Sequence, residues 1–65
     1  MVLKIYIIDG GERYYLSKWY VYDEIDCVVF TAIAKHAMKF RDRDVVNDYH
    51  YQLRAMGYQP RTEVC

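Results

Sequence analysis

The sequence predicts an α+β fold in which a small antiparallel β-sheet is packed by one main helix. Two β-rich segments begin the chain and flank the turn sequence Asp9-Gly10-Gly11-Glu12, and a later segment repeats apolar residues at helical spacing. All of this falls within 65 residues, so we expect one domain, residues 1–65. A chain of this size buries only about 60% of its unfolded surface, which limits its stability.

The N-terminal part predicts a β-hairpin. Residues 2–8 are β-branched or aromatic, which favours a strand with Leu3, Ile5 and Ile7 on one face. Gly10 and Gly11 form the turn, because glycine adopts positive φ without steric cost. Residues 13–22 then form the second strand.

The middle of the chain predicts a short third strand. The charges of Asp23, Glu24 and Asp26 indicate a loop, and residues 27–31 are typical of a short buried strand. Periodicity does not decide between helix and strand for residues 32–40. We expect an extended segment followed by one or two helical turns.

The clearest helix is predicted over residues 43–56. Asp42 or Asp44 provides its N-cap, and Gly57 suits the left-handed position that ends a helix. The tail, residues 58–65, alternates weakly and permits a C-terminal edge strand, where Pro60 is tolerated. One apolar stripe at helical spacing faces the sheet: Val46, Tyr49, His50, Leu53 and Met56.

Tyrosine is the most informative residue type in this chain, which contains eight of them. A regular strand over residues 13–22 would place Tyr15 and Trp19 on one face and three tyrosines on the other. One small core cannot use both faces, so several rings should reach solvent or a partner, and such rings are enriched at protein interfaces. The predicted partner-binding residues are Tyr14, Tyr15, Trp19, Tyr20 and Tyr22.

A basic run gives an alternative site for nucleic acid. Basic side chains beside aromatic rings can follow a phosphate backbone and stack bases. The formal net charge of zero weighs against this function, because nucleic-acid binders usually carry a basic excess. A solvated surface is the simpler interpretation. The residues of this alternative site are Lys35, Lys39, Arg41 and Arg43.

The sequence indicates neither a metal site nor a catalytic site. Cys27, His36, His50 and Cys65 are the soft metal ligands, and no two of them lie within four positions, unlike the close pairs of structural zinc sites. We therefore expect no metal, no cofactor and no enzymatic activity. Two cysteines, no signal peptide and no membrane-length apolar run predict a cytoplasmic protein with reduced thiols.

Several short segments together resemble tiny phage-encoded accessory proteins. They are the opening strand Lys4-Ile5-Tyr6-Ile7-Ile8, the aromatic strand Arg13-Tyr14-Tyr15-Leu16, the unit Ala37-Met38-Lys39-Phe40 and the helix end Leu53-Arg54-Ala55-Met56-Gly57-Tyr58. The resemblance implies a protein that binds and redirects or inhibits a bacterial host protein, anti-defence inhibitors of the anti-CRISPR kind included. It carries over no functional residue, and it would place the chain in the host cytoplasm.

We therefore predict a non-catalytic module that occupies a surface of a larger protein, such as a bacterial host or defence component. Two alternatives stay open. The first is a small nucleic-acid-binding regulator that uses residues 35–43. The second is a homo-oligomeric structural protein, for instance a homodimer, whose tyrosines meet their own copies.

Overall fold

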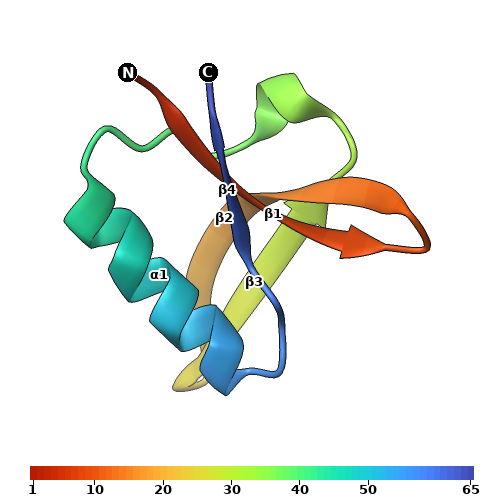
Figure 1. The fold of residues 1–65 in the computed structure, drawn as a ribbon. Helices are drawn as coiled ribbons and strands as arrows, with labels where there is room; N and C mark the ends of the chain where they lie inside the picture. The colour runs from red at the N-terminus through yellow and green to blue at the C-terminus, as the bar shows by residue number, and fades with distance from the viewer.

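The computed structural model describes residues 1–65 and shows a four-stranded antiparallel sheet with one α-helix on one face (Figure 1). The predicted α+β fold is confirmed, including the C-terminal edge strand. The strands lie in the spatial order β3-β2-β1-β4. The elements along the chain are β1 (Leu3–Asp9), β2 (Glu12–Tyr22), β3 (Ile25–Thr31), the 3₁₀ turn η1 (Ala34–His36), α1 (Arg43–Ala55) and β4 (Arg61–Val64).

Two tight hairpins connect the first three strands. Gly10 and Gly11 form the predicted first turn, with φ angles of 61° and 82°. The second turn is Asp23 and Glu24, which also have positive φ, at 52° and 62°. The prediction of a loop that extends to Asp26 was therefore wrong. Asp23 and Glu24 alone close the hairpin, and Asp26 lies in β3.

The third strand also differs from its prediction in burial. β3 begins at Ile25 and forms the outer edge of the sheet, so the expectation of a buried strand was wrong. Ile25 is 64% exposed and Val29 is 40% exposed. β-branched residues favour a strand for steric reasons and leave its place in the sheet undetermined.

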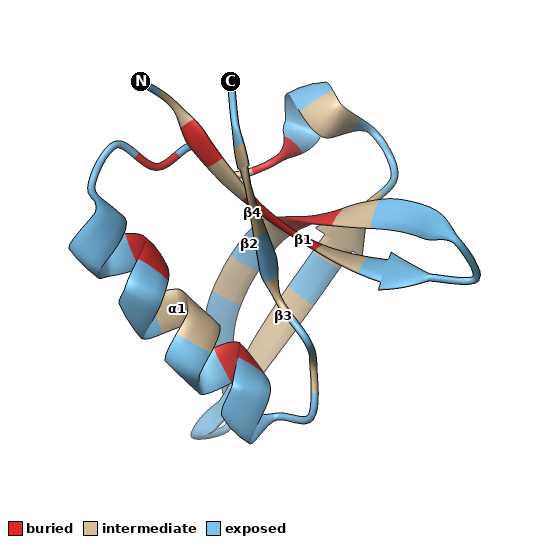
Figure 2. Ribbon diagram, viewed as in Figure 1, coloured by how far each residue is buried: buried red, intermediate tan, exposed pale blue.

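The core lies between α1 and the face of the sheet that it covers. Leu16 of β2 and Leu53 of α1 are fully buried, and Val46 lies about two turns before Leu53 on the same side of α1. Figure 2 shows the buried positions of α1 on the side of the helix that faces the sheet. The predicted stripe is confirmed except at Met56, which is the C-cap residue and is 39% exposed. The central cluster is Leu3, Ile5, Leu16, Phe40, Val46 and Leu53.

Residues 38–40 join the first two strands where those strands separate. The β1–β2 pairing ends at Tyr6 and Tyr15. Beyond that pair, the Met38 amide donates to the Leu16 carbonyl at 2.9 Å, and Phe40 exchanges two backbone hydrogen bonds with Leu3. The expected short helical turn before Phe40 is present as η1, on the face opposite α1.

The helices of this fold are too short to be candidates for a membrane span.

Candidate functional site

A β-bulge decides which aromatic side chains of β2 face the helix. Leu16 pairs with Phe30 and Lys18 pairs with Val29, so Ser17 is an extra residue on β2. An extra residue reverses the alternation of side chains along a strand. The prediction that residues 13–22 form a regular strand with two alternating faces was therefore wrong. Trp19 lies on the helix-covered face with Leu16, and Tyr15 lies on the opposite face.

Tyr15 belongs to the interior of the protein. Its side chain is buried against Tyr6, with ring centroids 5.9 Å apart, under Ala37 of the segment that follows η1. The Tyr15 hydroxyl donates to Glu63 Oε1 at 2.8 Å. The Glu63 acceptor and the burial together raise the pKa of Tyr15. Because this ring is covered, Tyr15 is not available as a surface anchor.

Trp19 and Tyr14 lie on the helix-covered face. The Trp19 ring packs on Tyr49 of α1 at a centroid distance of 5.2 Å, and its indole N–H donates to Asp26 Oδ1 at 3.2 Å. Tyr14 is half-buried opposite Ile7. The Trp19 ring therefore packs against the core, whereas Tyr14 is only partly covered.

Tyr20 and Tyr22 remain exposed at the far end of the face that α1 does not cover. They are 49% and 73% exposed, and they pair with Cys27 and Ile25 of β3. Figure 2 shows exposed residues around the Asp23–Glu24 turn at this end of the hairpin. We define the open-face patch by its residues, Tyr20, Tyr22, Ile25, Cys27 and Val29.

The β3 part of the open-face patch was missed by the sequence reasoning. Cys27 and Val29 were assigned to a buried strand, and Ile25 to a loop. The available signal was the alternation of Ile25, Cys27 and Val29, which places all three on one face of a strand. This alternation indicates an exposed strand face only when the turn is known to end at Glu24, because Ile25 then belongs to the strand.

Charged residues border this patch on two sides. The turn that ends it is acidic, with Asp23 and Glu24 exposed, and Lys18 lies beside Val29 on the same face. The single salt bridge of the structure lies elsewhere, between Arg13 and Glu63. The patch is therefore apolar in its centre and charged at its rim, as protein interfaces are.

The basic residues of the alternative site lie along the connection from η1 to the start of α1. All four are exposed, and none forms a salt bridge. A solvated surface of this kind could also hold ion pairs of Arg41 and Arg43 with Asp42 and Asp44, and the structure has none there. Asp42 instead caps α1, where its Oδ1 accepts from the Asp44 amide at 2.9 Å.

The thiols and histidines belong to different segments of the fold. Cys27 and Cys65 are free. His50 Nε2 lies 2.8 Å from Thr62 Oγ1, and burial, followed by the nearby Arg54 charge, lowers the pKa of His50. His36 is exposed in η1. No three His, Cys, Asp or Glu side chains are grouped as metal ligands would be.

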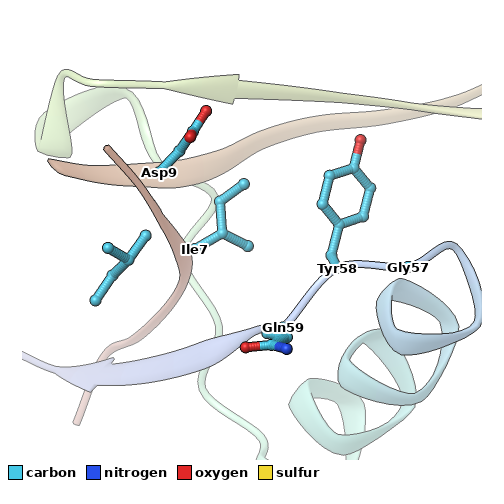
Figure 3. Close-up of a pocket in the computed structure, with 6 residues that line it drawn as sticks. Ile7, Asp9, Gly57, Tyr58 and Gln59 are labelled. Atoms are coloured by element: carbon cyan, nitrogen blue, oxygen red, sulfur yellow. The ribbon is translucent and has the colours of Figure 1, made fainter. Parts of the chain in front are cut away.

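One small hollow lies between the end of β1 and the connection from α1 to β4 (Figure 3). It has a volume of about 300 Å³ and is lined by Ile7, Ile8, Asp9, Gly57, Tyr58 and Gln59. Asp9 is its one carboxylate, and no cysteine, histidine or lysine joins it.

Comparison with protein-family models, with curated proteins and with solved structures found no match to this chain.

Proposed function

We propose that this protein is a non-catalytic protein-binding module and that the open-face patch is its binding surface. The supporting observation is the exposure of Tyr20 and Tyr22 beside Ile25, on a face that α1 leaves uncovered. Burying apolar surface contributes roughly 25 cal/mol per Å², so covering these side chains with a partner is favourable. Clustered exposed apolar side chains with a charged rim are typical of interaction sites.

Tyr20 and Tyr22 act as the anchors in this proposal. Interface anchors are commonly Tyr, Trp or Arg, and a few of them carry most of the binding energy. The acidic turn of Asp23 and Glu24 favours a target with basic residues next to an apolar depression. The target is a larger protein whose own site this chain occludes. The resemblance to phage accessory proteins makes a bacterial host or defence protein the most concrete target.

The test compares Tyr20→Ala and Tyr22→Ala with Tyr51→Ala as baits in bacterial lysate. Tyr51 is a matched control, because it is 73% exposed like Tyr22 but lies on α1. A target retained by the wild type and by Tyr51→Ala should be lost from Tyr22→Ala, with affinity reduced about thirtyfold for a loss of about 2 kcal/mol. Equal retention by all three variants would reject the open-face patch as the binding surface. Circular dichroism establishes that each variant is folded.

Nucleic-acid binding through Lys35, Lys39, Arg41 and Arg43 is the second candidate. The observation that favours it is the absence of any ion pair at these four exposed side chains. Binding through phosphate contacts weakens steeply with salt, whereas contacts made by aromatic anchors weaken little. Titration of a labelled oligonucleotide at two salt concentrations therefore separates the two functions.

A further inference from the structure

β3 is an edge strand without the features that usually keep such strands from pairing. It has seven residues, no proline and no lysine. Its one charged residue, Asp26, is bound to the Trp19 indole. The other edge strand, β4, is only four residues long, follows Pro60 and carries Arg61 and Glu63. Long apolar edges act as templates for another strand, whereas short charged edges with proline resist pairing.

We propose that a second copy of this chain pairs antiparallel with β3, around a two-fold axis at Val28, to join the two sheets. Val28 is the midpoint of Ile25–Thr31, so this register pairs every residue of β3. Ile25 then lies opposite Thr31 of the second copy, and Cys27 lies opposite Val29 of the second copy. Homodimers with a two-fold axis are the commonest assemblies, because one self-complementary surface suffices.

Backbone hydrogen bonding fixes which faces of the two copies combine. In an antiparallel ladder, every second residue of an edge strand directs its N–H and C=O groups away from its own sheet. The residues whose backbone groups point outward in one copy must pair with the outward-pointing residues of the second copy. Residues that pair in this way lie on the same face of the sheet. Both open faces therefore lie on one side of the joined sheet, and both α1 helices lie on the other. The two open-face patches become neighbours across the axis.

Charge complementarity favours a second copy as the occupant of this edge. The acidic turn, Asp23 and Glu24, precedes β3, and the exposed basic residue Lys35 of η1 follows shortly after the strand ends at Thr31. Antiparallel pairing brings the acidic end of each copy next to the basic end of the other. The chain has no net charge, so the two copies do not repel each other overall.

The dimer is independent of the proposed function, because it uses the edge of β3, whereas target binding uses the open face. Tyr20 and Tyr22 stay uncovered in the joined sheet, so a dimer would present both anchor pairs to a target. A variant can therefore lose self-association and still bind the target, or lose target binding and still self-associate.

Sedimentation equilibrium over a range of protein concentrations tests the dimer. The wild type should show twice the chain mass, and Val29→Lys should raise the dissociation constant about tenfold or more, because each dimer contains the change twice. Val64→Lys is the matched control, since Val64 is 54% exposed on the other edge strand, and it should remain dimeric. A wild type that stays at the chain mass, or a Val29→Lys variant as dimeric as the control, would overturn the proposal.

A cysteine pair tests the register. Directly opposite residues lie about 4.5–5.5 Å apart between Cα atoms, which is within the range for a disulfide. In a Cys65→Ser background, Val29→Cys should therefore form covalent dimers with Cys27 of the second copy when oxidised with diamide. Adding Cys27→Ser should abolish them, because the two introduced thiols are then offset along the strands. A dimeric protein that gives no covalent product with Cys27 present would overturn the axis at Val28.

Discussion

Glu63 Oε1 lies 2.7 Å from the Arg13 guanidinium, although the two residues are 50 positions apart in the chain. The same oxygen accepts the Tyr15 hydroxyl at 2.8 Å, and the Arg13 guanidinium stacks over Tyr6 at 4.4 Å from its ring centroid. One carboxylate on β4 therefore meets two side chains of β2 across the intervening β1. This cluster attaches the last strand to the N-terminal hairpin.

We predict that Glu63→Ala loosens β4 while the rest of the fold persists. The change removes the acceptor shared by Arg13 and Tyr15, and β4 is a short edge strand whose one neighbour in the sheet is β1. Amide hydrogen exchange should become faster in β4 and change little in α1, because local openings differ in free energy across a structure. Glu12→Ala is the control, since Glu12 is exposed and makes no side-chain hydrogen bond. Equal protection of β4 in the two variants would show that the cluster contributes nothing to its attachment.

We predict that Leu53→Ala disrupts folding while Arg54→Ala does not. Leu53 is fully buried in the central cluster, and truncating a buried leucine costs about 2–5 kcal/mol. A core in a domain this small rarely supplies more than about 3–5 kcal/mol of stability. Arg54 is the adjacent exposed residue on α1 and should change the stability by about 0.5 kcal/mol or less. Thermal melts followed by circular dichroism measure both changes, and similar melting temperatures would contradict the assignment of the buried helix face.

The sequence was sufficient for the elements whose signals are local. Gly10 and Gly11 permit the first turn by their own backbone freedom, and Val46 and Leu53 show the buried side of α1 by their spacing. The second turn was not predictable in this way, because Asp23 and Glu24 are held at positive φ by the pairing of the flanking strands.

The candidate site depended on a feature that the sequence does not show. The bulge at Ser17 arises where β2 leaves β1 and the Met38 amide takes up the Leu16 carbonyl, a contact between distant segments. A regular strand over residues 13–22 would put Tyr15 and Trp19 on the same face, whereas the bulge puts them on opposite faces. Tyr20 and Tyr22 did prove exposed, as the surplus of rings suggested.

We predict that the protein loses stability as the pH falls through the ordinary pKa of His50. Burial, and then Arg54, lower the pKa of His50 in the folded protein below the usual 6.5, so the folded state favours the neutral ring. The unfolded chain then binds the proton more readily, and acidification below about pH 6.5 favours unfolding. The contribution of His50 is fully present above pH 6.5 and decreases toward the lower folded pKa.

His50→Gln should flatten this part of the stability profile, because glutamine does not titrate and can still hydrogen-bond to Thr62. Urea denaturation at a series of pH values measures the effect. His36→Gln is the control, because His36 is exposed in η1 and should leave the slope as it is in the wild type. The explanation fails if the His50→Gln profile retains the wild-type slope between pH 6.5 and the acid limb.

The turn between β2 and β3 gives a prediction of increased stability. Glu24 has a φ of 62°, a left-handed conformation that costs a non-glycine residue about 1–2 kcal/mol. Glycine at the second position of a two-residue turn adopts this conformation without that cost, although it loses more entropy on folding. Glu24→Gly should therefore stabilise the fold by up to about 1 kcal/mol. Glu12→Gly is the opposite control, because Glu12 lies within β2 and should destabilise the protein when replaced. Denaturant melts compare the two variants, and a Glu24→Gly variant less stable than the wild type would mean that the glutamate side chain itself supports the turn.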